Sequence, residues 1–359
     1  MVVLSDVTKS NEAIASTFPQ GLVAVFVGGT SGIGEYTLKA LAAHSPNSRV
    51  YLVGRAQDAA DRIIKECKEL SPSSHFEFIK ADIGLLNVVD DVCSRIKSKE
   101  TAINILFQSQ GTLARKTGTV YRRILITLSR SAADSLLVTE EGLFVQRALK
   151  LHSRTRFTTN LLPLLQNATS LRRVVSVLVG TKEGPIDLTN LDGENLALTE
   201  SRTQSASMVT LLLEEAARVA PDVSFVHDYP GFVKSGIMKT IDNPVTYVLG
   251  NVLTYLASPF ISISPAESGE RHLFLATSAR YAPSQGDAGV AGVPASGDVA
   301  VAKGSDGKMG SGVYTVNERC ESGGPLVDGI LAKMREDGTA QKVWDHIEAD
   351  IIRITAKKA

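Results

Sequence analysis

The sequence predicts an α/β fold in which helices cover both faces of a doubly wound parallel sheet of about seven strands. Three observations support this fold class. Residues 22–27 form an unbroken apolar run rich in β-branched side chains, which is typical of a strand buried on both faces of a sheet. Closely spaced glycines follow, and residues 35–41 then have the apolar spacing of a helix. Strand-like and helix-like segments continue to alternate, as in consecutive right-handed strand–helix–strand units.

The glycine-rich turn at residues 28–34 is the strongest functional signal in the chain. Where such a turn opens a helix, backbone N–H groups and the helix dipole together favour a phosphate. Gly28 can adopt backbone angles closed to other residues, Gly32 leaves room for a pyrophosphate, and Gly34 allows close packing of helix on strand. The turn therefore predicts nucleotide binding in a Rossmann-like sheet. The residues expected to border the nucleotide are Gly28, Thr30, Ser31, Gly32, Ile33 and Gly34.

The other elements follow in order along the chain. Further strands are predicted at 49–55, 75–82, 103–107, 172–180, 223–229 and 312–317, and helices at 58–70, 87–97, 143–165, 205–220 and 265–278. A parallel sheet of this kind binds its ligand at the carboxyl ends of the strands. Residues that directly follow a strand are therefore the candidates for a site.

The chain divides into three parts by pattern. We expect an N-terminal arm at 1–20, a cofactor-binding domain at 21–324 and a C-terminal helical cap at 325–359. Within the domain, residues 112–141 are basic and lack helical spacing or caps. We interpret roughly twenty of them as an insertion, either a translated intron or a functional loop.

Two further segments of the domain have unusual composition. Residues 236–266 contain a stretch without charge, from 243 onward, which asparagine and proline make a poor membrane span. We interpret this segment as a lid over an apolar ligand. Residues 283–312 are rich in Gly, Ala, Ser and Pro, and this composition predicts a long extended loop.

The overall composition excludes several classes of protein. Hydrophobic residues make up 43% of the 359 residues, as in ordinary globular proteins. The 38 basic residues balance the 38 acidic ones, so no nucleic-acid partner is expected. The three cysteines, Cys67, Cys93 and Cys320, lie far apart and have no metal-ligand spacing. The polar N-terminus does not resemble a secretory signal, and we expect a cytoplasmic protein.

The chain resembles the short-chain dehydrogenase/reductase family in two motifs. The first is the glycine turn, in which three residues separate Gly28 from Gly32, although Val27 stands where the family has threonine. The second follows the predicted sixth strand and reads Pro230-Gly231-Phe232-Val233-Lys234-Ser235, with serine for the family's threonine. The resemblance covers roughly 22–317 and is closest to fungal biosynthetic-cluster oxidoreductases. It implies work on a secondary metabolite, and it suggests a homodimer that pairs through two long helices.

The resemblance also assigns roles along the cofactor. Arg55 ends the second strand, where a guanidinium suits a 2′-phosphate and favours NADP(H) over NAD(H). Asp82 stands where the family contacts the adenine, although it could instead cap the next helix. Gln110 and Gly111 form an altered cofactor wall. The resemblance places the nicotinamide against the backbone of the second motif, namely Pro230, Gly231, Val233 and Ser235.

The family's catalytic tetrad of asparagine, serine, tyrosine and lysine is absent. No tyrosine lies between Tyr121 and Tyr229, and no Tyr-x-x-x-Lys occurs anywhere in the sequence. Counting back from Pro230 puts Arg202 and Ala206 near the positions of the tyrosine and lysine. The asparagine's place falls near Lys150.

Three other residues could supply a proton to a substrate oxygen. Thr181 and Lys182 leave the fifth strand at its ligand end, and Tyr229 immediately precedes the nicotinamide motif. Each also has a purely structural interpretation, as a turn, a surface residue and a packing residue respectively. His227 and His272 are interpreted as structural.

Three functions remain open from the sequence. The first is an NADP(H)-dependent oxidoreductase that acts on an apolar small molecule with a non-standard proton donor. The second is a cyclase, isomerase or dehydratase that keeps NADP as a scaffold. The third is a cofactor-binding protein without catalysis.

Overall fold

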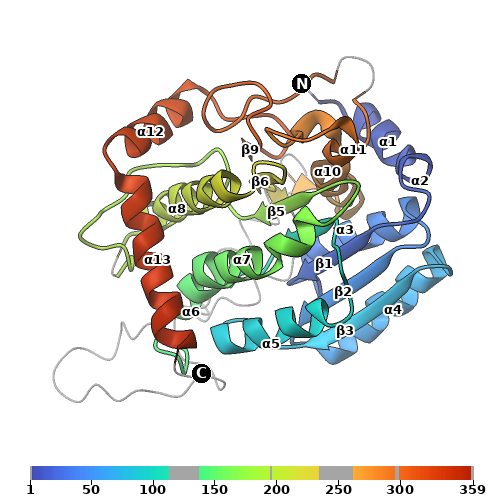
Figure 1. Ribbon diagram of the computed structural model, residues 1–359, viewed down its shortest axis with the longest axis horizontal. Helices are drawn as coiled ribbons and strands as arrows, with labels where there is room; N and C mark the ends of the chain where they lie inside the picture. Colours follow the sequence, from blue (N-terminus) through green and yellow to red (C-terminus); the bar gives the residue numbers. More distant parts are fainter. Residues whose placement is uncertain (1, 113–136, 195, 234–261, 296–298, 357–359) are drawn as a thin grey trace.

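The structure, a computed structural model, describes residues 2–112, 137–194, 196–233, 262–295 and 299–356 (Figure 1). Seven parallel strands form one sheet in the order β3-β2-β1-β4-β5-β6-β9. They are β1 (Val23–Val27), β2 (Arg49–Gly54), β3 (His75–Lys80), β4 (Ile105–Gln108), β5 (Arg173–Val177), β6 (Ser224–Asp228) and β9 (Val313–Val316). The order reverses at β1, between β2 and β4, so a crevice opens there at the carboxyl ends of the strands. The predicted fold class is confirmed.

Two helical layers bury the two faces of the sheet. Alternation along β1 sends Ala24 and Phe26 to one core and Val25 and Val27 to the other. The first core is closed by α3 (Gly32–His44), α4 (Gln57–Leu70) and α10 (Pro265–Thr277). The second is closed by α5 (Leu86–Lys97), α7 (Ser153–Gln166) and α8 (Leu198–Val219). Both faces are therefore apolar, which explains the unbroken hydrophobic run of the first strand.

Helices at both ends of the chain pack onto this frame. The N-terminal arm forms α1 (Leu4–Glu12) and α2 (Ile14–Thr17), and Asn11 Nδ2 donates to the carbonyl oxygen of Glu270 on α10 at 2.9 Å. The C-terminal residues form α12 (Pro325–Glu336) and α13 (Thr339–Thr355). Figure 1 shows α13 running across the ends of α7 and α8, and its Ile347 and Ile351 enter the second core. The face on which the family resemblance suggests pairing is thus partly covered by the chain itself.

Two predicted helices differ from expectation in their bounds. The long helix after the insertion is broken into α6 (Val145–Arg147), a π-helical turn η1 (Ala148–His152) and α7. Helix α8 begins at Leu198 rather than 205, because the Glu200 carboxylate accepts a hydrogen bond from the Ala197 N–H at 3.1 Å and caps it.

The remaining segments are short. Strands β7 (Phe232–Val233) and β8 (Ser262–Ile263) pair with each other. The short helix η3 (Ala279–Tyr281) precedes the Gly/Ala/Pro-rich loop, and α11 (Ala288–Ala291) lies within that loop. Most of the predicted insertion (113–136), most of the predicted lid (234–261) and Ser235 lie outside the described residues. Cys67, Cys93 and Cys320 are free and buried, and burial raises the pKa of each thiol to about 12.

Candidate active site

The glycine turn joins β1 to α3 at the switch point of the sheet. Gly28 has a φ of 84°, and a Cβ there would lie 2.6 Å from the backbone nitrogen of Gln110. A Cβ on Gly34 would lie 2.5 Å from Ser109 Oγ and 2.8 Å from Gly29 Cα. Both contacts are closer than a methyl group tolerates, so these positions require glycine. Ser31 is extended and its side chain does not cap α3, which leaves the first-turn N–H groups facing the crevice.

The adenosine side of this crevice lies over β2 and β3. Thr30 packs against Gly54 at the end of β2, where a Cβ would approach Thr30 Cγ2 to 2.8 Å. Arg55 follows directly and is exposed, as a residue that grips a phosphate from solvent must be. Asp82, half-buried after β3, accepts a hydrogen bond from the Gly84 N–H at 3.1 Å. Thr30, Arg55 and Asp82, all predicted to contact the cofactor, therefore lie at the ends of adjacent strands.

Asp82 does not cap the next helix, so that alternative interpretation is wrong. The N-terminus of α5 is capped instead by Glu141, whose carboxylate accepts from the Leu86 N–H at 2.5 Å and the Asn87 N–H at 3.0 Å. The cap comes from more than fifty residues away in sequence, beyond the reach of local helix-capping rules. The Asp82 carboxylate instead accepts the Gly84 N–H within its own turn.

The opposite wall of the crevice is built by residues after β4 and β6. Gln110 is buried against Gly28, and its side-chain Oε1 has no hydrogen-bond partner among the described residues. Gly111 follows it and is exposed. Pro230 and Gly231 follow β6, and Gly231 has a φ of 71°, which only glycine adopts readily. Val233 lies in β7 and is half-buried.

Arg154 on α7 ties the ends of β4 and β5 together, and the sequence analysis missed it. Its Nη1 donates to the carbonyl oxygen of Gln108 at 2.8 Å and to Ser176 Oγ at 2.7 Å. Its Nη2 donates to the carbonyl oxygens of Gln110 at 2.6 Å and Val177 at 3.0 Å. The side chain is fully buried, and burial lowers the pKa of Arg154 to about 9. A guanidinium thus fixes the strand ends, behind the cofactor wall.

The structure brings two of the three predicted proton donors together and adds a third residue. Lys182 Nζ lies 5.0 Å from the centre of the Tyr229 ring. The guanidinium carbon of Arg202, on α8, lies 5.0 Å from the same ring centre. Both cations are exposed, and Tyr229 is half-buried directly before the Pro230 turn. Arg202 is the residue that sequence counting places near the family's tyrosine, so its side chain meets a tyrosine that comes from β6 instead.

Thr181 lies apart from this group. It has a φ of 63°, its hydroxyl is buried without a partner among the described residues, and its N–H donates to Thr315 Oγ1 at 2.6 Å. A side chain closed off in this way is poorly placed to reach a substrate oxygen. Of the predicted donors, Lys182 and Tyr229 are therefore the better placed.

A second buried network lies behind Thr181. Glu183 is buried, and its Oε1 accepts from Thr315 Oγ1 at 2.6 Å and from Thr210 Oγ1 at 2.7 Å. His227 Nδ1 lies 2.8 Å from Thr210 Oγ1, and its Nε2 accepts from the Val179 N–H at 3.3 Å. Burial opposes ionisation, but His227 and the two threonines hold the pKa of Glu183 below its usual value. The network joins the segment after β5 to β6, β9 and α8.

His272 is also buried, as a structural role requires. Its Nε2 lies 2.8 Å from Asp228 Oδ2, which joins α10 to the end of β6.

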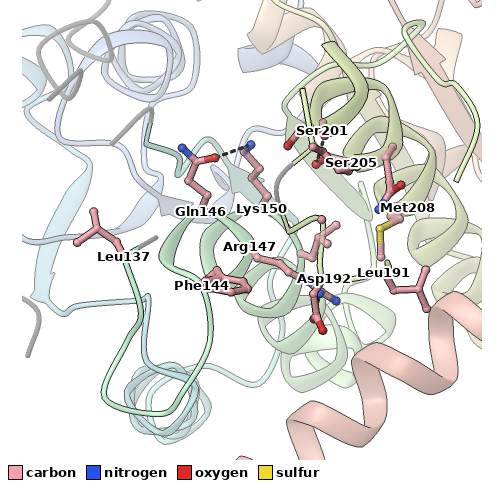
Figure 2. Close-up of a pocket in the computed structure, with 14 residues that line it drawn as sticks. Leu137, Phe144, Gln146, Arg147, Lys150, Leu191, Asp192, Ser201, Ser205 and Met208 are labelled. Carbon is pink, nitrogen blue, oxygen red and sulfur yellow. Dashed lines mark hydrogen bonds and ion pairs between the residues drawn. The ribbon is translucent and has the colours of Figure 1, made fainter. Parts of the chain in front are cut away.

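A pocket opens near the N-terminal end of α8 (Figure 2). It lies between the α6–η1 segment, the loop before α8 and the first turns of α8. Figure 2 shows Lys150 and the two serines Ser201 and Ser205 facing this space from opposite helices. Its apolar wall is formed by Leu137, Phe144, Leu151, Leu191, Leu196 and Met208. Ser201 and Ser205 lie in the first turns of α8, the helix that also carries Arg202.

Comparisons with known proteins agree with this geometry. The family model for short chain dehydrogenases matches residues 22–122. An oxidoreductase of Emericella nidulans named AN1596 is 37% identical over 97% of this chain and 98% of its own length. The short-chain dehydrogenase/reductase SAT2 of Stachybotrys chartarum is 32% identical over 97% of each chain. The chain belongs to the short-chain dehydrogenase/reductase family.

Solved structures of this short-chain dehydrogenase/reductase fold match the same frame. The L-sorbose reductase of Gluconobacter frateurii, in complex with NADPH and L-sorbose, aligns with a TM-score of 0.50 and 18% identity. The alignment covers 71% of this chain and 89% of the reductase. A reductase of Serratia marcescens with two phenylalanine-to-leucine substitutions aligns with a TM-score of 0.51 and 18% identity, covering 72% and 91%. No helix in the described ranges has the length and apolarity needed to cross a bilayer.

Proposed function

We propose that this short-chain dehydrogenase/reductase is an NADP(H)-dependent reductase of apolar carbonyl compounds, with Tyr229 as its proton donor. The observation that supports it best is the Tyr229 ring held by Lys182 and Arg202 directly before the Pro230–Gly231 turn. The sequences of the fungal relatives, several of them named oxidoreductases, extend the proposal to a secondary-metabolite intermediate.

The residues of the crevice fit an NADP cofactor. The glycines leave room that a Cβ would fill, and the first turn of α3 presents uncapped N–H groups to a pyrophosphate. Arg55 is exposed at the end of β2, where its guanidinium can form a bidentate contact with a 2′-phosphate. NADPH bound here would supply the hydride.

The chain's own residues then handle the proton. When hydride reaches the carbonyl carbon, the C=O π electrons move to oxygen and create an alkoxide that needs a proton. Tyr229 gives its hydroxyl proton to that oxygen and becomes a tyrosinate. Lys182 and Arg202 stabilise the negative charge because both cations lie against the ring. Water then returns the proton, since both cations are exposed to solvent.

The experiment follows cofactor and product together. Purified protein is mixed with NADPH and a panel of apolar ketones and aldehydes, and absorbance of reduced nicotinamide is read alongside product mass. Cofactor consumption with a product that has gained two hydrogen atoms supports the reductase. Replacement of Tyr229 with Phe removes only the hydroxyl and is expected to lower kcat by about 10²–10⁴-fold, with NADPH affinity unchanged.

The missing tetrad favours a second candidate, a non-redox enzyme that keeps NADP as a scaffold. Its signature is an isomeric or dehydrated product with the cofactor intact. Binding of NADPH without any turnover would instead leave a cofactor-binding protein. In the Tyr229→Phe variant, wild-type kcat for NADPH oxidation would contradict Tyr229 as the donor.

A further inference from the structure

The pocket of Figure 2 contains a buried guanidinium that is only partly satisfied. Arg147 lies at the end of α6, and its side chain is 7% exposed. Its Nη1 pairs with Asp192, on the loop that forms the opposite wall of the pocket. Its Nε and Nη2 have no hydrogen-bond partner among the described residues. These two nitrogens form one edge of the planar guanidinium.

Neighbouring acids do not occupy that edge. Asp350 on α13 lies near enough to favour the charged form of Arg147, but its two oxygens receive His152 Nε2 at 3.1 Å and Arg353 Nη2 at 2.6 Å. Asp192 meets His346 Nε2 at 3.4 Å in addition to Arg147. Burial lowers the pKa of Arg147 to about 10, so the side chain is still charged at neutral pH.

A buried donor without an acceptor costs free energy, and a bidentate carboxylate matches this edge better than any other common group. Other atoms of the protein cover both nitrogens, and neither nitrogen has a hydrogen-bond partner among the described residues. A carboxylate that displaces this cover would gain two charge-assisted hydrogen bonds. A more highly charged phosphate fits less well, because Asp192 already brings a negative charge to the same guanidinium.

We propose that this pocket binds the carboxylate of an apolar carboxylic acid, through Nε and Nη2 of Arg147. The hydrocarbon part of the ligand lies against the wall of Leu137, Phe144 and Met208. Ser201 and Ser205 line the pocket from α8, the helix whose Arg202 meets the Tyr229 ring. This inference rests on the proposed function and names its substrate class as an apolar carboxylic acid with a carbonyl group.

The test compares a charged ligand with its neutral equivalent. Octanoate and octanamide have the same length, and each is titrated by calorimetry into the protein saturated with NADP⁺. We expect octanoate to bind at least about tenfold more tightly, since a charged hydrogen-bonded pair is lost with the amide. Equal affinity for the two compounds, or no detectable octanoate binding, would overturn the proposal.

Two substitutions assign the preference to Arg147. Arg147→Gln is expected to abolish it, and Arg147→Lys to weaken octanoate binding about tenfold because an ammonium keeps the charge but has no planar edge. Arg218→Gln, on the exposed end of α8, is the matched control and should bind octanoate as the wild type does. If Arg147→Gln lowers only the melting temperature and keeps the octanoate preference, the pairing of Arg147 with Asp192 only stabilises the fold and the proposal fails. If Arg147→Gln does not fold, the octanoate affinity of Arg147→Lys tests the proposal, and an affinity equal to that of the wild type would overturn it.

The outcomes separate this inference from the proposed function. NADP⁺ affinity and the kcat of Tyr229→Phe report on the reductase and do not involve Arg147. A wild-type protein that reduces neutral carbonyl compounds but binds octanoate no more tightly than octanamide would therefore reject only the carboxylate site.

Discussion

The two halves of the crevice are built by different means. On the side of β1, β2 and β3, the backbone makes the site: glycines, a helix N-terminus and strand ends that follow one another closely in sequence. On the side of β5, β6 and β9, side chains from distant elements make it. One group consists of Lys182 after β5, Arg202 in α8 and Tyr229 after β6. The Glu183 network joins residues from four parts of the chain.

The difference shows which half is free to change its chemistry. A site formed by the backbone tolerates few substitutions, because a Cβ at Gly28 or Gly34 would overlap neighbouring backbone atoms. A site built from side chains can be assembled from other elements, and here Tyr229, which follows β6, meets cations from α8 and from the segment after β5. The chain therefore keeps the family's cofactor turn while it lacks the family's tetrad.

The largest expected effect is on the strand ends that Arg154 joins. Arg154→Met leaves three backbone carbonyl oxygens buried without their donor, and we expect it to lower the free energy of unfolding by about 3–5 kcal/mol. Urea denaturation measures this change. Arg218→Met, an exposed arginine on α8, should leave the denaturation midpoint unchanged. Similar midpoints for both variants would contradict the role given to Arg154.

The next effect concerns the backbone half. In Gly28→Ala, a methyl group meets the Gln110 backbone and the positive φ is strained, so NADPH affinity should fall more than about 100-fold. Calorimetric titration with NADPH is the measurement. Gly329 in α12 has open space around it, and Gly329→Ala should bind NADPH normally. Wild-type affinity in the Gly28 variant would show that the nucleotide binds elsewhere.

A smaller effect tests the choice of cofactor. Arg55→Glu reverses the charge at the end of β2, so NADPH affinity should fall about tenfold or more while NADH affinity holds or rises. The ratio of the two dissociation constants measures the switch. A ratio equal to that of the wild type would remove Arg55 from the 2′-phosphate site.

The smallest effect is a pH dependence of the contact between η1 and α13. His152 is fully buried beside Asp350, and burial lowers the pKa of His152 below its usual 6.5. The unfolded chain therefore binds a proton near pH 6.5 while the folded chain does not, and stability present above that pH is lost as pH falls. We expect a loss of up to about 1.4 kcal/mol one pH unit below 6.5.

Urea denaturation across this range checks the loss, and His152→Asn should remove it. An increase in stability on acidification would contradict the sign, because it would mean that the folded protein binds the proton more tightly than the unfolded chain.

The sequence predicts the backbone half well and the side-chain half poorly, for a physical reason. The alternation of strands and helices, the glycine turn and the placement of Arg55 and Asp82 at strand ends follow from local patterns along the chain. Arg154 and Glu141 act across more than forty residues, and nothing in their local sequence marks their partners. A charged residue among the apolar positions of α7 was the one available signal for Arg154.

The candidate site shows the same division. Tyr229 and Lys182 could be named as candidate donors because each comes soon after a predicted strand, whereas their meeting with Arg202 depends on the position of α8. Thr181 follows a strand too, but its positive φ turns the hydroxyl into the protein. Strand ends thus indicate where a site lies, and the packing of helices decides which side chains enter it.

The central claim is that Tyr229 protonates a substrate oxygen beside a nicotinamide bound in this crevice. The most direct measurement is single-turnover oxidation of bound NADPH by the best carbonyl substrate of the panel, compared between the wild type and Tyr229→Phe. The account predicts an NADPH-bound protein in both cases and a rate at least about 100-fold lower in the variant. Equal rates, or a wild-type protein that binds no NADPH, would contradict it.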